Sequence, residues 1–255
     1  MTSAEWLRPV EDDLTSIAMS LARRLHRGAT LWCVSPSEAD HARALADRFA
    51  RSSGGGEPGP SAVALPADGL VAALRSRARA GDVVVMIADG TEPQIRELAR
   101  RAPAWDLTTV WIGAGERPTP GSADLVFWLD DAERSIDADL DLDELARRLS
   151  ELTHLALADP GVGDIEVVEG AVCVTCADEG QLAEVVELHP DGFSATVRVA
   201  GELRDVDTSL IDPPAANDLL LIHAGSVLQN LDAAVEGTPV AQAPTGTVAS
   251  DGSVS

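Results

Sequence analysis

The chain has 255 residues, of which 45% are hydrophobic and 24% are charged, and these values are typical of a globular protein with two modest domains. Its formal net charge of -23 repels nucleic-acid phosphates and anionic membrane surfaces, so we expect neither as a partner. No apolar run reaches the roughly 18 residues that span a bilayer, the acidic start lacks a signal-peptide pattern, and three cysteines argue against a disulfide framework, so we expect a cytoplasmic protein.

The first 160 residues alternate between helix and strand patterns. Apolar residues recur at helical spacing in five segments: 1–28, 38–51, 69–80, 93–101 and 142–157. Apolar and β-branched runs predict five strands: 29–34, 61–65, 82–88, 108–113 and 125–129. Strands that alternate with helices are typical of βαβ units, so residues 1–160 are predicted to form an α/β domain with three layers around a parallel sheet.

The pattern changes after residue 163 to short strands separated by turn residues. We expect strands at 165–172, 181–188, 193–200, 202–207 and 219–223. Five short strands with this spacing predict a small, OB-like β-barrel domain at 165–236. Leu228 to Val235 is expected to form a short closing helix. Residues 237–255 are rich in Thr, Ser, Gly, Pro and Ala and are expected to be a disordered tail.

Two cysteines and a histidine in the barrel sequence predict a metal site. Cys173 and Cys176 flank Val174-Thr175, and His223 follows an apolar strand about fifty residues later. A soft thiolate and an imidazole suit iron and other transition metals. A structural zinc site is an alternative, with His189 as the further ligand that zinc requires, and a redox pair or inert thiols are others. Cys33 lies inside an apolar strand and is expected to be a core residue.

These residues carry a resemblance to the HypC/HybG/HupF family of hydrogenase maturation chaperones. Cys173-Val174-Thr175-Cys176 is similar to a Cys-x-Thr-Cys variant of the first family signature, and residues 217–225, Asn-Asp-Leu-Leu-Leu-Ile-His-Ala-Gly, resemble the second. The resemblance implies that the barrel carries or relays iron as Fe(CN)2CO, transiently, from a HypD-type maturation protein to the large-subunit precursor of a [NiFe] hydrogenase. It implies Cys173 as ligand and docking residue, with His223 and Cys176 as the further metal candidates. A protein of this kind is not an enzyme.

Residues 10–155 are similar to the SIS (sugar isomerase) fold, as in phosphoheptose isomerase-like proteins. In that family, two loops at helix N-termini hold a sugar phosphate. The corresponding loops here, residues 33–40 and 88–93, lack the family's glycines, and Glu38, Asp89 and Glu92 stand where a phosphate would sit. Ser35, Ser37 and Thr91 are expected to cap the helices.

The degenerate SIS-like domain is therefore expected to serve as a docking platform or to form a homodimer through the apolar faces of its helices. The alternative is an SIS-type sugar-phosphate-binding protein or isomerase whose barrel is regulatory.

Overall fold

The computed structural model describes residues 8–51, 59–129, 142–159 and 180–233. Five strands form one parallel sheet in the order β2-β1-β3-β4-β5. They are β1 (Leu31–Val34), β2 (Ala62–Ala64), β3 (Val83–Ile87), β4 (Thr108–Ala114) and β5 (Leu125–Leu129). All five residues of β3 are buried, as its β-branched run predicts for a strand that is covered on both faces. The predicted parallel α/β fold is confirmed.

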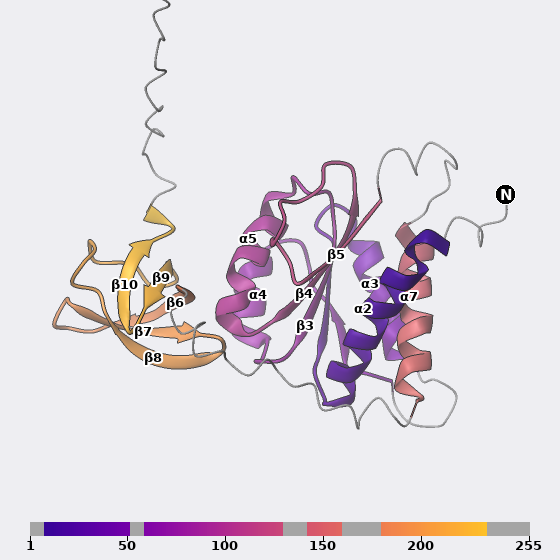
Figure 1. Cartoon of the computed structure of the whole chain (residues 1–255), viewed down its shortest axis with the longest axis horizontal. Coiled ribbons are helices and arrows are strands. Elements are labelled where there is room, and N and C mark those ends of the chain that lie inside the picture. Colours follow the sequence, from indigo (N-terminus) through magenta and orange to yellow (C-terminus); the bar gives the residue numbers. More distant parts are fainter. Residues whose placement is uncertain (1–7, 52–58, 130–141, 160–179, 234–255) are drawn as a thin grey trace, which may run out of the picture.

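Helices cover both faces of this sheet (Figure 1). One face carries α2 (Arg8–His26), α3 (Ala39–Ala50) and α7 (Leu142–Leu157), and the other carries α4 (Leu70–Arg77), α5 (Pro93–Arg101) and the 3-10 helix η1 (Ala102–Trp105). The apolar faces of α2, α3 and α7 pack with the sheet in one cluster, so they no longer argue for a dimer. No helix in the described ranges is long and apolar enough to cross a membrane.

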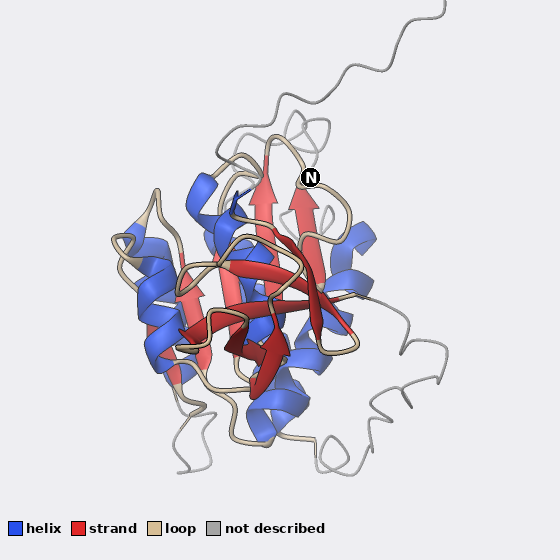
Figure 2. Cartoon of the chain, turned by 90° about the vertical axis from the view of Figure 1, so that its left-hand side faces the viewer, coloured by secondary structure: helices blue, strands red, loops and turns tan. Residues whose placement is uncertain are grey.

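The second part of the chain is a closed five-stranded barrel in the order β10-β8-β7-β6-β9. Figure 2 shows its strands in front of the parallel sheet. The strands are β6 (Gln181–Leu188), β7 (Ser194–Val199), β8 (Glu202–Asp207), β9 (Leu219–His223) and β10 (Ser226–Asn230). The predicted barrel is confirmed.

The expected closing helix is wrong. Its first residues belong to β10, which pairs antiparallel with β9, with Val227 buried and Leu228 exposed. Pairing with β9 satisfies the backbone of these residues and buries Val227, which a helix starting at Leu228 would not do. The strand predicted at 165–172 and the tail at 237–255 lie outside the described residues.

The barrel and the α/β unit (α2 to α7) share an apolar core. Leu219 of β9 is fully buried in the same cluster as Leu74 of α4, Leu98 of α5 and Trp105 of η1. The tight turn between β7 and β8 also contacts η1, where the Gly201 amide donates to the Ala104 carbonyl over 3.0 Å. The barrel is therefore packed against the helices of the α/β unit and is not merely tethered to it (Figure 1).

Candidate functional site

His223 lies at one rim of the barrel, where several strand ends meet. It is the last residue of β9 and pairs with Ser226, the first residue of β10. On the other side of β9, Ile222 pairs with Gln181, so Gly180 lies opposite His223 at the point where the chain joins β6. The His223 side chain is half-buried. The segment that carries the two cysteines therefore joins the barrel beside the predicted histidine ligand.

The predicted thiolate ligands, Cys173 and Cys176, lie outside the described residues. Among the residues that are described, no cluster of three or more His, Cys, Asp or Glu side chains could hold a metal ion. His189, the further ligand considered for zinc, has both ring nitrogens engaged: Nδ1 with Ser194 Oγ and Nε2 with Thr196 Oγ1, each at 2.9 Å. His189 can therefore bind a metal only by giving up a hydrogen bond.

Cys33 is a core residue, as predicted. It is completely buried within β1, and this burial raises the pKa of its thiol far above the ordinary value. A thiol held neutral in an apolar core is neither a nucleophile nor a metal ligand.

The carboxyl edge of the parallel sheet is occupied by the chain's own acids. In a sheet of this strand order, a ligand would bind where the connections leave β1 and β3 in opposite directions. There Asp89 accepts hydrogen bonds from the Thr91 amide at 2.8 Å and the Thr91 hydroxyl at 2.7 Å. Glu38 lies 3.1 Å from the His41 ring. Carboxylates at these helix starts disfavour a bound phosphate.

The expected helix caps are wrong. The residues before α3 and α5 are Glu38 and Glu92, and neither side chain caps its helix. Thr91 instead donates a hydrogen bond from its hydroxyl to Asp89, and this local side-chain contact competes with helix capping.

A buried carboxylate joins the barrel to the α/β unit. Glu184 of β6 is 1% exposed and accepts from both Nε and Nη2 of Arg75, at 2.9 and 2.8 Å. Arg101 Nη1 donates to the same oxygen, Oε1, over 3.3 Å, and the other oxygen, Oε2, accepts from the Trp105 indole at 2.8 Å. Arg75 also lies over the Trp105 ring, 5.8 Å from its centroid. One carboxylate thus serves donors from α4, α5 and η1, which ties the three elements to the barrel.

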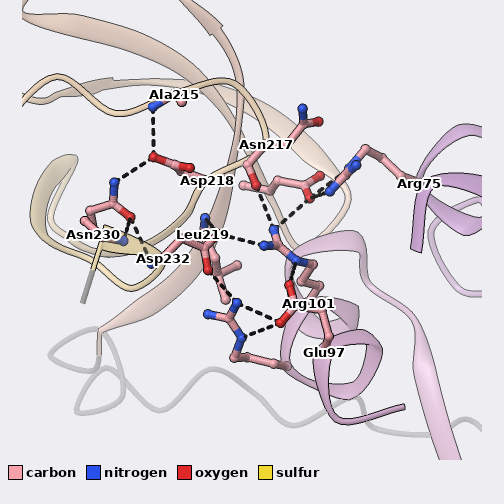
Figure 3. A network of polar contacts seen from close by, with 12 residues as sticks. Arg75, Glu97, Arg101, Ala215, Asn217, Asp218, Leu219, Asn230 and Asp232 are labelled. Atoms are coloured by element: carbon pink, nitrogen blue, oxygen red, sulfur yellow. Dashed lines mark hydrogen bonds and ion pairs between the residues drawn. The ribbon is translucent and has the colours of Figure 1, made fainter. Parts of the chain in front are cut away.

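A second carboxylate, Asp232, extends this network (Figure 3). It accepts from Arg101 Nη2 at 2.6 Å, from Arg100 and from the Leu219 amide at 2.9 Å. Arg101 also donates to the Asn217 carbonyl at 2.7 Å. Burial alone would raise the pKa of Asp232, but its hydrogen bonds from Arg100, the Leu219 amide and Arg101 lower it. Asp232 therefore remains ionised within the interface.

The alternating pattern of β6 did not predict this network. Ala183 and Val185 face the barrel interior, so Glu184 points outward. From the local sequence alone, an outward-facing glutamate is expected to be exposed to solvent. The α/β unit, which is far away in sequence, covers that face. Asp232 lies seven positions after Gly225, the last residue of the second signature segment, and this proximity is the signal that could have drawn attention to it.

Comparisons with known proteins assign the barrel. Residues 180–236 match the HupF/HypC family. The barrel is a HupF/HypC domain. The match contains all five barrel strands and His223, and it begins after Cys173 and Cys176. No curated protein sequence matches the chain.

Solved structures with a fold similar to the rest of the chain include three bacterial proteins. A sugar-phosphate isomerase assigned in Listeria monocytogenes has 12% identity and a TM-score of 0.41, with 56% of this chain and 75% of that chain covered. A protein of E. coli CFT073, solved as a complex, has 15% identity and a TM-score of 0.39, covering 62% and 92%. A phosphoheptose isomerase of Francisella tularensis has 12% identity and a TM-score of 0.37, covering 62% and 97%. Two of the three are named as isomerases of sugar phosphates, and nothing about a ligand of this chain follows from similarities at this level.

Proposed function

We propose that this protein is a hydrogenase maturation chaperone whose HupF/HypC domain holds the Fe(CN)2CO unit as cargo between a HypD-type donor and the large-subunit precursor of a [NiFe] hydrogenase. The match of residues 180–236 to the HupF/HypC family carries the proposal. Cys173 is the thiolate ligand, His223 is the imidazole ligand, and Cys176 is the alternative thiolate.

The position of His223 supports this ligand set. Gly180 directly precedes β6 and lies opposite His223, because the next residue, Gln181, pairs with Ile222. Cys176 is four positions before Gly180 and Cys173 is seven positions before it, so the extended chain spans at most about 14 Å and about 25 Å, respectively. Both thiols are therefore within chain reach of the rim. A thiolate is a soft ligand for iron, and binding of the metal favours deprotonation of a thiol whose pKa is otherwise about 8.5.

Infrared spectroscopy of the protein, purified anaerobically with its donor, tests the ligand set. Wild type should show bands of iron-bound CO and cyanide. Cys173→Ala should abolish them, His223→Ala should weaken them, and Cys176→Ala should have a smaller effect. His189→Gln is the matched control, because this barrel histidine is engaged by Ser194 and Thr196. Full bands in both Cys173→Ala and His223→Ala would refute the ligand set, and loss in Cys176→Ala alone would shift the thiolate to Cys176.

The α/β unit acts in this proposal as a platform for the barrel and not as an isomerase. Asp89 and Glu38 stand at the helix starts that a phosphate would need, and repulsion between two unit charges about 4 Å apart is roughly 4 kcal/mol at an effective dielectric near 20. A hydrogen bond from Ser or Thr contributes only about 1 kcal/mol net. The full-length protein should show no thermal shift with a panel of sugar phosphates, whereas a clear stabilisation by any of them would revive the isomerase alternative.

A further inference from the structure

A groove runs along β10 on the barrel surface. Asp207 at the end of β8 pairs in parallel with Ser226 at the start of β10, and the chain beyond Asp207 continues beside β10. The resulting groove has a volume of about 620 Å³. One wall is formed by residues 209–213 and the other by residues 228–230 and Ala233. We name it the β10 groove.

Large apolar side chains are exposed along this groove. Leu210 is 71% exposed on one wall, and Leu228 is 52% exposed on the other. Phe193, 66% exposed, lies beside the first wall, because its carbonyl accepts from the Thr208 amide at 2.8 Å. Single exposed leucines are common on soluble proteins, but a leucine on each wall of one groove with a phenylalanine beside it is typical of a contact surface.

The docking of the α/β unit leaves this groove open. That unit covers the outer face of β6 through Glu184 and contacts the turn at Gly201. In the barrel order, β10 lies between β8 and β9 and is not a neighbour of β6. Leu228, the first groove residue on β10, lies two residues beyond Ser226, which pairs with His223. A bound chain that continued past Leu228 toward the start of β10 would reach the rim that carries the predicted ligand.

The negative charge around the groove favours a partner segment that carries positive charge. The described barrel, residues 180–233, contains nine acidic residues and two arginines. Arg198 lies 4.0 Å from Glu184, and Arg204 pairs with Glu202 at 3.1 Å, so neither lines the groove. Asp212 is the charged residue among the lining side chains. An apolar groove in an acidic surface fits a partner segment with apolar anchors flanked by Lys or Arg.

We propose that the β10 groove binds an apolar, basic segment of the HypD-type donor and so holds that partner along the strand that begins beside His223. This inference rests on the proposed function. A second copy of this chain fits less well, because each copy carries a net charge of -23 and copies repel one another.

The test is the affinity of purified full-length variants for the purified donor, measured by biolayer interferometry at two salt concentrations. Leu210→Asp/Leu228→Asp should weaken binding more than about tenfold, because each substitution replaces an apolar contact with a carboxylate that the interface would have to bury. Leu203→Asp is the matched control: Leu203 is 60% exposed on β8 and does not line the groove, so it should change binding less than about threefold. Asp212→Arg should weaken binding and reduce its dependence on salt.

The outcomes separate the groove from the proposed function. If the double variant bound the donor as tightly as wild type, the groove would not be the binding site, and the proposed chaperone function would be unaffected. Equal losses in the double variant and in Leu203→Asp would also overturn it. No binding of the donor by wild type would overturn both. Light scattering that shows a dimer for wild type and a monomer for the double variant would overturn the donor assignment in favour of a second copy.

Discussion

Glu184→Ala should strongly destabilise the protein, although Glu184 lies on the outer face of a barrel strand. The substitution removes the acceptor of two hydrogen bonds from Arg75 and one from the Trp105 indole. Arg101 loses its contact with Glu184 but still donates hydrogen bonds to Asp232 and to the Asn217 carbonyl, so it remains partly paired. Removing one member of a buried ion pair costs about 3–5 kcal/mol. Since the Arg75 side chain is 24% exposed and can reach water, we expect the lower end, about 3 kcal/mol.

Urea unfolding at neutral pH measures this loss of unfolding free energy, and two further variants serve as comparisons. Glu184→Gln keeps an acceptor oxygen and should cost less, about 1–2 kcal/mol, in the range of a single buried hydrogen bond. Glu187→Ala changes an exposed glutamate of the same strand and should stay within about 0.5 kcal/mol of wild type. If Glu184→Ala were as mild as Glu187→Ala, the network would not hold the barrel to the α/β unit, and the reasoning would be refuted.

Three further predictions concern backbone space, protonation and thiol chemistry. Gly201→Ala should destabilise the protein more than Gly192→Ala. Both glycines have positive φ, but a Cβ at Gly201 would lie 2.7 Å from the Ala80 Cβ, whereas a Cβ at Gly192 would meet open space. The difference between the unfolding free energies of the two variants therefore measures the cost of the close contact at Gly201. The pKa of Asp232 is lowered in the native state, so its ion pairs stabilise that state fully above the unfolded-state pKa of about 4. This stability is lost as the pH falls through the lower native pKa, and Asp232→Asn should therefore flatten the curve of unfolding free energy against pH below about pH 5. Cys33 should resist iodoacetamide at mildly alkaline pH in the native protein and react after unfolding, as peptide mass spectrometry would show; labelling of the native protein would contradict its burial.

The α/β elements could be predicted closely from sequence because each has a strong local signal. The run at 82–88 is apolar and β-branched, and β3 occupies Val83–Ile87 within it. The pattern at 142–157 has helical spacing, and α7 has those bounds. In such segments the local preference and the tertiary burial agree, so the pattern alone suffices.

The last barrel strand was missed because local preference and tertiary pairing disagree there. Leu228 and Gln229 are good helix formers, but the neighbouring β9 supplies the backbone partners that make Ser226–Asn230 a strand. The Glu184 network was missed for a similar reason. An outward-facing glutamate on an alternating strand normally meets water, and only the distant helices α4 and α5 make this one a buried ion pair. For the candidate site, His223 as a ligand stays a prediction from the sequence, and the structure places it at the end of β9, opposite the point where the chain enters β6.

The core that the barrel shares with the α/β unit limits how this protein can be re-engineered. Leu219 is completely buried in the cluster that contains side chains of α4 and η1, so a barrel excised from this chain would present an apolar side chain to water beside an uncompensated Glu184. Exchange of this barrel for one that evolved to stand alone would leave Arg75 and Arg101 facing a surface without their carboxylate acceptors. A successful chimaera must therefore transplant the interface positions of β6, β9 and the Gly201 turn together with the barrel.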